Sequence, residues 1–383
     1  MSDYLPEEVL IEIFLRLPAK WVMNSRTNDR IMVRHYERSL LKDIVKLHRD
    51  DDGSFIPDEE LILPLDARRS PYAIIDSSFG LVCLYGFVFR TRPKHIVIWN
   101  PSLGFSKRIL VKPFDEDHFE EPIYGFGFDP KSNDHKVVRI LYHQQRRYVG
   151  EGVVKSVEIY ALNVGEWVDI SGKAAPGCLI KDSLSRAYVD GAVYWVAQMN
   201  VGVISRKLVL SLFDLSDETF KTLEMPDELK WKTKLVEQKF QNEQLKVVAM
   251  NKSLSLVHFF IQWTKSPSFD GCNIWMLVEN GGARGYWTIK YRVDLRLGIA
   301  NVLGLRKNGE VVLVARHTYE LICFPIGSRK IRYLDMIGDW STFYMNTYIE
   351  SLRLYERGNH EFINNFDSSA VPATGNGDEL TEA

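Results

Sequence analysis

The sequence has 383 residues, of which 45% are hydrophobic and 26% are charged, a composition that suits a folded protein with a large buried core. Its formal net charge of −2 argues against a nucleic-acid or membrane-surface binder, because phosphate binding requires an excess of lysine and arginine. No apolar stretch reaches the roughly 18 residues that cross a bilayer, and acidic residues stand where a signal peptide would be basic.

The first 50 residues are predicted to be helical. Pro6 begins a helix whose first turn carries two acidic residues, which favour the helix dipole. An apolar stripe follows at helical spacing and ends at Pro18; it consists of Val9, Leu10, Ile13, Phe14 and Leu17. A second helix is predicted from Ile31 to His48, with a basic residue at every fourth position along a solvated face.

From residue 55 to 356 the pattern changes to short apolar strands separated by Gly, Asn, Asp and Ser, which is typical of a β domain. The polar segment from residue 357 to 383 carries five acidic residues and one arginine. It has too few apolar residues to bury, so it is predicted to be a disordered tail.

The β region repeats itself. Five units of four strands each cover about residues 73–110, 124–170, 188–223, 245–289 and 301–334. Units of this length are typical of kelch-like propeller blades. Strands near Leu61–Leu65 and Tyr344–Tyr355 remain, and one shared blade made from both would hide the free edges of the ring. The repeat therefore favours a six-bladed propeller over a β-sandwich.

The long connections of these units fall between second and third strands or between one unit and the next, so in an up-and-down blade they leave on one face. Long loops on a rigid face commonly bind ligands. We therefore predict substrate binding there, led by Tyr142, Arg146, Arg147 and Tyr148 in a connection rich in interface-type residues. A solvated hairpin connection is the alternative interpretation of this segment.

Several segments together resemble plant F-box proteins that carry an F-box-associated β-propeller. Asp3–Lys20 is similar to the first half of a plant F-box, with its Leu-Pro-x-Glu start and its Leu-Pro end. Further motifs follow in the family's order: Gly80–Leu84, Trp99–Pro101, Tyr124–Pro130 with Asp134–Val138, Val189–Trp195 and Tyr348–Leu352. Similar proteins include the S-locus F-box proteins of pollen self-incompatibility and immune-regulating F-box proteins.

The resemblance implies a mostly β protein with an N-terminal helical, partial F-box followed by a kelch-like propeller. It also implies membership of a Skp–cullin–F-box ubiquitin ligase, in which the F-box binds the Skp adaptor and, through it, cullin, while the propeller binds an unidentified substrate protein. On the matching positions, the adaptor-binding residues are Leu5, Pro6, Ile13, Phe14, Leu17 and Pro18.

The chain departs from the family after Lys20. The family continues with a Leu-rich stretch and a Cys-containing segment, whereas this chain continues with Trp21–Asp29. A second interpretation therefore stays open, in which the propeller is a protein-binding module that is uncoupled from the ligase.

No pattern for catalysis or for a cofactor is present in the sequence. It lacks a P-loop, an HExxH motif, a Gly-x-Ser-x-Gly elbow and a metal-binding spacing of His and Cys. The paired glycines of Tyr124–Phe128 indicate close strand packing rather than phosphate binding, because no helix follows them. The four cysteines are scattered and mostly lie in apolar runs, which favours a reduced compartment, the cytoplasm or the nucleus. We expect a non-enzymatic protein that binds no metal.

Overall fold

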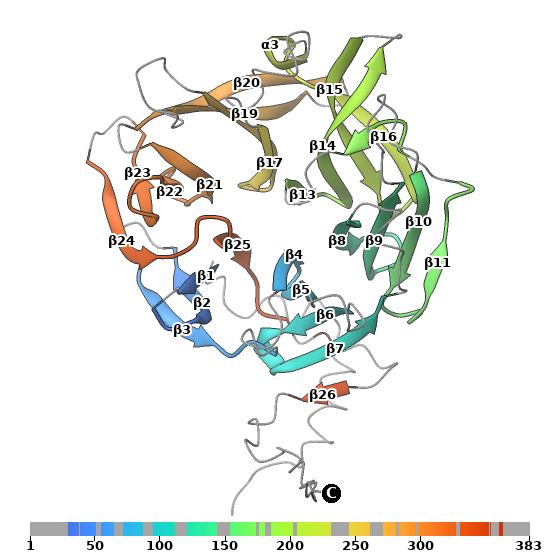
Figure 1. Cartoon of the computed structure of the whole chain (residues 1–383), viewed down its shortest axis with the longest axis horizontal. Coiled ribbons are helices and arrows are strands. Elements are labelled where there is room, and N and C mark those ends of the chain that lie inside the picture. Colours follow the sequence, from blue (N-terminus) through green and yellow to red (C-terminus); the bar gives the residue numbers. More distant parts are fainter. Residues whose placement is uncertain are drawn as a thin grey trace, which may run out of the picture.

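The structure is a computed structural model. The residues that it describes are 30–37, 39–50, 55–64, 72–86, 95–111, 121–143, 154–173, 176–180, 185–201, 205–230, 245–260, 271–280, 283–295, 298–326, 330–351, 353 and 360–362. Six antiparallel sheets stand around a central axis as the blades of a β-propeller (Figure 1). The six-bladed fold predicted from the repeat is thus confirmed.

Blades 1 to 3 follow one another along the chain and contain the first three predicted repeat units. Blade 1 comprises β4 (Tyr72–Ser78), β5 (Leu81–Gly86), β6 (His95–Asn100) and β7 (Phe105–Leu110). Blade 2 comprises β8 (Ile123–Asp129), β9 (Asp134–Tyr142), β10 (Val154–Ala161) and β11 (Trp167–Asp169). Blade 3 comprises β12 (Leu179–Ile180), β13 (Arg186–Val189), β14 (Ala192–Val201), β15 (Ser205–Asp214) and β16 (Thr219–Glu224).

Blades 4 and 5 contain the remaining two repeat units, and blade 6 combines both ends of the propeller sequence. Blade 4 comprises β17 (Leu245–Met250), β18 (Ser253–Phe260), β19 (Gly271–Asn280) and β20 (Ala283–Asp294). Blade 5 comprises β21 (Ile299–Leu305), β22 (Val311–Ala315), β23 (Glu320–Phe324) and β24 (Arg332–Ile337). Blade 6 comprises β25 (Tyr344–Tyr348), β1 (Arg30–Glu37), β2 (Lys42–Arg49) and β3 (Pro57–Leu61). Within the described ranges, two short helices, η1 (Pro101–Leu103) and α3 (Asp227–Lys230), lie in connections.

Strands from both ends of the chain close the ring, as predicted. The innermost strand of blade 6 is β25, and it pairs antiparallel with β1 from Arg30↔Tyr348 to Arg34↔Tyr344. The N-terminal contribution is larger than predicted, because it supplies three strands instead of the single strand expected near residue 61. This pairing leaves neither end of the ring as an open sheet edge.

The predicted second helix, Ile31–His48, is wrong. These residues form the hairpin of β1 and β2, and the propeller begins at Arg30 rather than near residue 55. Both strands are buried on both sides, so the apolar residues show no simple alternation that would have revealed them. The first predicted helix, with its stripe ending at Pro18, lies outside the described residues.

The segment predicted to be a disordered tail contributes one described element. Strand β26 (His360–Phe362) pairs antiparallel with β7 and adds a fifth strand to the outer edge of blade 1 (Figure 1). The prediction of disorder is therefore wrong for these three residues, whose backbone groups pair with a strand edge that the sequence pattern did not show to be open. The remaining residues after Arg353 lie outside the described part of the chain.

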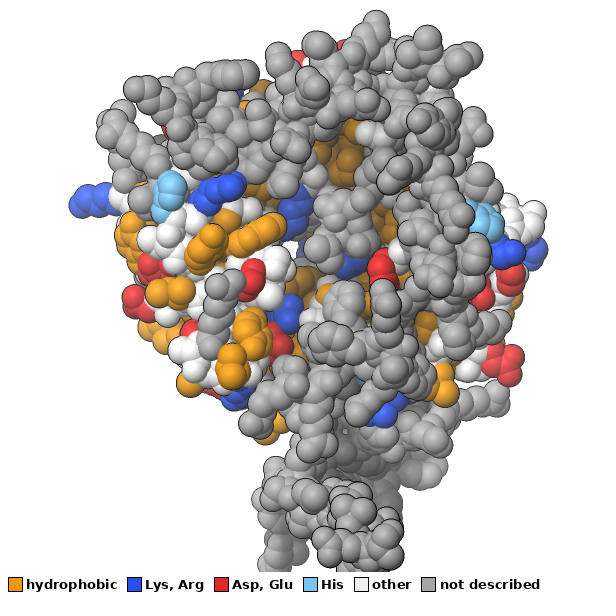
Figure 2. All heavy atoms as spheres, in the orientation of Figure 1, with side chains coloured by type: hydrophobic (Ala, Val, Ile, Leu, Met, Phe, Trp, Pro, Cys, Tyr) orange, Lys and Arg blue, Asp and Glu red, His pale blue; other side chains and the backbone are white. Residues whose placement is uncertain are grey.

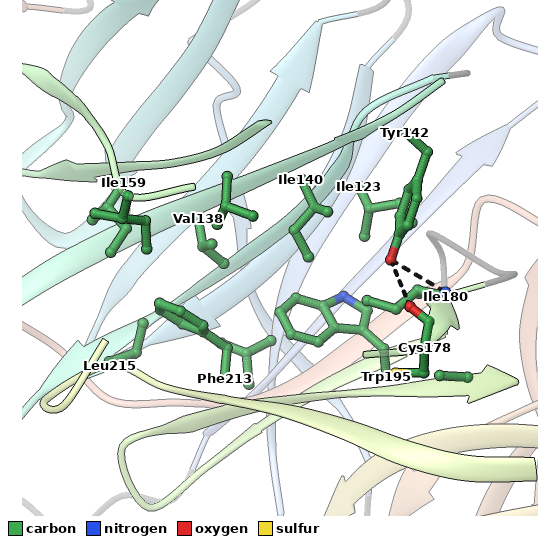
Figure 3. Close-up of a cluster of buried hydrophobic side chains, with 14 of the residues drawn as sticks. Ile123, Val138, Ile140, Tyr142, Ile159, Cys178, Ile180, Trp195, Phe213 and Leu215 are labelled. Carbon is green, nitrogen blue, oxygen red and sulfur yellow. Dashed lines mark hydrogen bonds between the residues drawn. The ribbon is translucent and has the colours of Figure 1, made fainter. Parts of the chain in front are cut away.

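The core consists of apolar layers between neighbouring blades. Among the described residues, six buried clusters each join side chains from two adjacent blades. In the layer between blades 2 and 3, Trp195 and Phe213 of blade 3 pack against Val138 and Ile140 of blade 2 (Figure 3). Because both sides of each sheet are covered, the ring is rigid, and its two faces carry the connections.

Candidate interaction surface

The strand order divides the connections between two faces of the ring. Counted outward from the axis, the first and second strands of a blade are joined on one face, as are the third and fourth; we call this the turn face. The second and third strands, and successive blades, are joined on the opposite face, which we call the loop face. The long connections therefore share the loop face.

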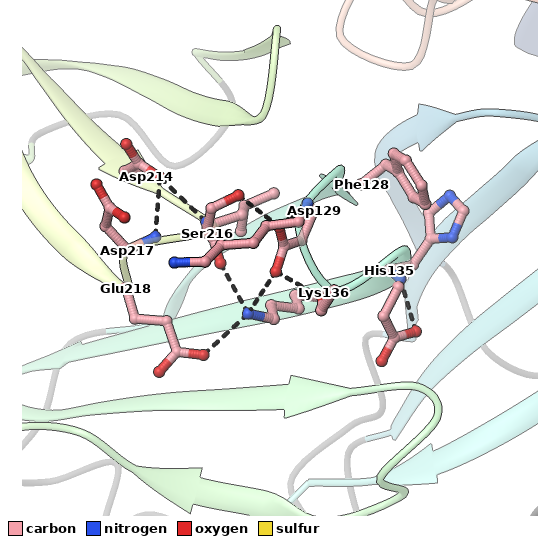
Figure 4. A network of polar contacts seen from close by, with 12 residues as sticks. Phe128, Asp129, His135, Lys136, Asp214, Ser216, Asp217 and Glu218 are labelled. Atoms are coloured by element: carbon pink, nitrogen blue, oxygen red, sulfur yellow. Dashed lines mark hydrogen bonds and ion pairs between the residues drawn. The ribbon is translucent and has the colours of Figure 1, made fainter.

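Buried polar contacts join the blades on the turn face. The Lys136 amine in blade 2 lies 2.9 Å from the Asp129 carboxylate, and it donates to Glu218 at 2.9 Å and to the Leu215 carbonyl at 2.7 Å (Figure 4). The Ser216 hydroxyl also donates to Asp129. Since residues 215–218 belong to blade 3, this Lys136 network fastens the first turn of blade 2 to blade 3.

Both central groups of the Lys136 network are charged. Burial opposes charge on either group, but hydrogen bonds from Ser132, Ser216 and Lys136 outweigh it and hold the pKa of Asp129 well below its ordinary value. In the same way, burial lowers the pKa of Lys136, whereas its bonds to Asp129 and Glu218 raise it, with a net upward shift. The Lys136 and Asp129 side chains are 8% and 1% exposed, so each depends on the other for compensation of its charge.

A second buried network joins blades 5 and 6 on the same face. The Arg306 side chain is fully buried, and its guanidinium donates to Asp50 at 2.9 Å and to Glu310 at 2.6 Å. It also lies over the Phe55 ring at 5.2 Å. Asp50 and Phe55 lie in the connection between β2 and β3, so blade 5 is fastened to blade 6 as blade 2 is to blade 3.

The chain beyond β25 covers part of the turn face. The Asn100 side chain donates to the carbonyls of Ser351 and Arg353 at 2.9 and 3.1 Å, and Arg353 donates to the Asn133 side chain at 2.8 Å. Ser351 passes so close to Gly80 that a Cβ at residue 80 would lie 2.4 Å from the Ser351 Cβ. The turn face over blades 1 and 2 therefore holds the ring together and is partly covered.

The motif residues 124–138 have structural roles. A Cβ on Gly127 would lie 2.2 Å from the Tyr188 ring, and one on Gly125 would lie 2.7 Å from the Trp195 ring, so the glycines serve close strand packing, as predicted. His135 is fully buried, its Nε2–H donates to the Ser78 carbonyl at 3.0 Å, and burial lowers its pKa to about 3. These groups join blades 1, 2 and 3 and are not free for chemistry.

On the loop face, two connections of blades 5 and 6 lie within the described residues. The turn from Arg316 to Tyr319 joins β22 to β23 and is closed by the Tyr319 amide, which donates to the Ala315 carbonyl at 3.0 Å. The connection from Gly338 to Phe343 joins β24 to β25. The Gly338 amide donates to the Tyr319 carbonyl at 3.2 Å, so the two connections are fixed beside each other.

Large apolar side chains are exposed on these two connections and at the end of β24. Tyr319, Ile337 and Trp340 are 43%, 55% and 43% exposed, and we call these three residues the aromatic patch. Figure 2 shows apolar side chains gathered at the left of the view, where Figure 1 places blades 5 and 6. The sequence analysis missed this patch. A signal was present, because Gly338-Asp339-Trp340-Ser341 places a tryptophan among turn-forming residues.

Only one of the predicted site residues can be placed. Tyr142 is 1% exposed, and its hydroxyl donates to the Cys178 carbonyl at 3.2 Å in the layer between blades 2 and 3 (Figure 3). This side chain therefore has no surface for a partner, and it secures the end of β9. Arg146, Arg147 and Tyr148 lie outside the described residues.

The predicted adaptor-binding residues Leu5, Pro6, Ile13, Phe14, Leu17 and Pro18 also lie outside the described residues. No helix in the described part of the chain is long and apolar enough to cross a membrane. Among the same described residues, no group of three or more His, Cys, Asp or Glu side chains could hold a metal ion.

Comparison with known proteins gives a consistent result. The family model for the F-box associated beta propeller domain matches residues 78–367. The F-box protein CPR1 of Arabidopsis thaliana is 23% identical over 392 residues, which cover 92% of this chain and 90% of CPR1. The putative F-box protein At3g16210 of the same plant is 25% identical over 240 residues, and the match spans 59% of this chain and 62% of that relative. Among solved structures, polysaccharide lyase Uly1 matches with a TM-score of 0.40 at 10% identity over 80% of each chain.

Proposed function

The chain belongs to the plant F-box protein family with an F-box-associated β-propeller, and on this premise we propose that it is the substrate-recruiting subunit of a Skp–cullin–F-box ubiquitin ligase. In this proposal the N-terminal segment binds the Skp adaptor and, through it, cullin. The loop face binds the protein to be ubiquitinated, and the chain itself performs no catalysis. The proposed compartment is the cytoplasm, the nucleus or both.

The path of the chain supports adaptor binding and substrate binding by different parts of the protein. Arg30 pairs with Tyr348 at the turn-face end of β1, so residues 1–29 join the propeller there. The connections of the loop face, including the aromatic patch, lie at the opposite ends of the strands. Adaptor binding by residues before Arg30 and substrate binding on the loop face are compatible with this path of the chain.

Substrate contact by Arg146, Arg147 and Tyr148 remains part of the proposal. These residues belong to the connection between β9 and β10, which leaves blade 2 on the loop face. This connection starts from the end of β9, which the buried Tyr142 side chain holds in the core. Arginine and tyrosine are common in interface hot spots.

One observation favours the uncoupled module as a second candidate. The resemblance to an F-box covers residues 3–20, and in the family the pattern continues with a further helix. In this chain Arg30–Arg49 are instead strands of blade 6, tied to the propeller by pairing with β25. The part of this chain that resembles an F-box therefore lies before Arg30.

Adaptor binding tests the proposal. We expect the double substitution Leu5→Ala and Pro6→Ala to weaken Skp capture by the full chain at least about tenfold, since each buried side chain of this kind contributes about 1.5–3 kcal/mol. Pull-down of Skp and cullin with the purified chain measures the effect. The matched control is Glu12→Ala, on the opposite side of the predicted helix, which should capture Skp like the parent.

Two results would decide between the candidates. Skp capture that is lost in the double variant but kept in the control supports the ligase subunit. No Skp capture by the unmodified, folded chain would support the uncoupled module instead.

A further inference from the structure

We propose that Asp76 is a pH-sensitive contact at the axis of the ring, which holds the closing strand β25 against blade 1 more firmly when its carboxyl group is protonated than when it is ionised. The inference concerns the closure of the propeller and does not depend on the ligase function. It rests on where this side chain lies, which groups it contacts and which charges surround it.

Asp76 lies where the innermost strands of three blades meet. Strands β13 of blade 3 and β25 of blade 6 both contact β4 of blade 1 near the axis (Figure 1). Strand β4 has a bulge directly before Asp76, because its pairing with β5 passes from Ile74↔Leu84 to Asp76↔Cys83. Such a bulge changes the direction of the side chains that follow it. Asp76 is only 7% exposed at this junction.

Two side chains of β25 contact Asp76 and the residue beside it. The Tyr344 hydroxyl lies 3.2 Å from the Asp76 carboxylate and 2.9 Å from the Ser77 hydroxyl. The Asn346 amide donates to the Asp76 carboxylate and to the Ser77 carbonyl, each at 3.4 Å. Since Tyr344 and Asn346 belong to the strand that closes the ring, the state of the Asp76 carboxyl group affects the closure directly.

The partners of the Asp76 carboxylate compensate its charge only partly. Besides the two β25 side chains, the backbone amides of Ser77 and Tyr188 donate to it, and all four donors are neutral. The positive charge of Arg186 is near, but its guanidinium donates to the carbonyls of Ile75 at 2.6 Å and Tyr124 at 3.3 Å. A buried carboxylate with neutral donors is costly to keep ionised.

The other titratable groups around Asp76 are neutral near pH 7. Burial raises the pKa values of the Cys83 thiol on β5, the Tyr188 phenol on β13 and the Tyr344 phenol on β25, so all three stay protonated. The His135 ring on β9 is neutral, because burial lowers its pKa to about 3. For Asp76, burial outweighs the hydrogen bonds and the nearby Arg186 charge and raises the pKa to about 6. Asp76 therefore titrates close to neutral pH.

This difference in pKa gives the sign of the pH effect. The carboxyl group of an unfolded aspartate has a pKa of about 3.9, whereas that of Asp76 in the folded chain is about 6. Its stabilising contribution is therefore fully present below the unfolded value and is lost as the pH rises through the folded value. From about pH 5 to about pH 7.5, this group alone should raise the unfolding equilibrium constant about tenfold.

Asp76→Asn tests the inference in the full chain, because asparagine keeps the size and a hydrogen-bond acceptor but does not titrate. Chemical denaturation at about pH 5 and about pH 7.5 measures the unfolding equilibrium constants. The ratio of the parent's constant to that of the variant should rise about tenfold with pH. The matched control is Asp294→Asn, at an exposed position on the outer strand β20, which should follow the parent at both pH values.

Hydrogen exchange provides a local measurement on the parent itself. After correction for the intrinsic pH dependence of exchange, the amides of Tyr344–Tyr348 should open more readily at the higher pH. Tyr344→Phe removes a donor that favours the ionised form, so it should move the midpoint of this change to lower proton concentration, that is, to higher pH. This variant and the parent's own exchange test the inference even if Asp76→Asn does not fold.

Three results would overturn the inference. A ratio of unfolding constants that is equal at both pH values would show that Asp76 does not titrate in this range. Amides of β15 in blade 3 that respond to pH as strongly as those of β25 would show that the effect is not local to the closing strand. An unchanged midpoint in Tyr344→Phe would show that β25 does not sense the Asp76 carboxyl group. Since none of these measurements involves the adaptor or a substrate, they leave the proposed ligase function untouched.

Discussion

A chain that ends at Ser341 is expected to aggregate or to lose cooperative unfolding. This truncation removes β25 and leaves the backbone groups of β1 without the partners from Tyr344 to Tyr348. It also removes Thr342, which binds Arg34, and opens the layers that blade 6 shares with both neighbours. The combined loss should exceed about 5 kcal/mol, which is comparable to the whole stability of a typical domain.

Solubility, size-exclusion profile and thermal unfolding of the truncated chain measure this effect. The control is a chain that ends at Arg357, which keeps β25 and loses only β26 and the residues beyond it. Because β26 contributes three residues at the outer edge of blade 1, the control should melt within a few degrees of the parent. A chain ending at Ser341 that stays monomeric and melts like the parent would contradict closure by β25.

Lys136→Met is expected to destabilise the protein by about 3–5 kcal/mol, the usual cost of removing one partner of a buried ion pair. Methionine keeps the apolar stem of the side chain but leaves the Asp129 carboxylate, 1% exposed, without its cation. Chemical denaturation of both chains measures the difference. Lys42→Met is the matched control, because its ion pair with Glu60 has the same length of 2.9 Å but side chains that are 60% and 46% exposed. That loss should stay below about 1 kcal/mol.

The double variant Lys136→Met with Asp129→Asn tests the interpretation. With both charges removed, no buried carboxylate remains uncompensated, so part of the stability should return. If the double variant is less stable than Lys136→Met by the full cost of a second independent change, the two groups do not act as a pair.

Lowering the pH should reduce the difference in the free energy of unfolding between Lys136→Met and the parent. The pKa of Asp129 lies lower in the folded parent than in the unfolded chain, so its stabilising contribution is fully present above the unfolded value and is lost as pH falls through the folded value. In the variant, a protonated Asp129 no longer needs a cation. Denaturation curves at pH 7 and near pH 3 measure this effect, and a constant difference at both pH values would contradict it.

The sequence determined the blades because each strand pattern is local. The turn residues and apolar runs of about residues 73–334 marked five units, and each became a blade. The same local signals marked the paired glycines of residues 124–128 as a packing feature, because a glycine in a strand shows where another chain segment approaches closely.

Only the tertiary structure decided the conformation of residues 31–48. Basic residues at every fourth position, such as Arg30 and Arg34, fit one face of a helix, but a spacing of four also places them on one face of a strand. The strand prevails because β1 pairs with β25, more than 300 residues away along the chain. Arg34 is buried instead of lying on a solvated face, and it donates to the carbonyls of Tyr72 and Thr342, two contacts that local periodicity cannot show.

The sequence determined one part of the candidate surface, and the tertiary structure decided the other. Sequence determined that the long connections share a face, since this follows from the strand order alone. Which side chains are available on that face depended on burial. Tyr142 lies at the end of β9 and Trp340 lies in the connection between β24 and β25, yet the first packs between two blades at 1% exposure, whereas the second is 43% exposed. Exposure is a property of the neighbours that the fold brings together, and those neighbours are distant in the sequence.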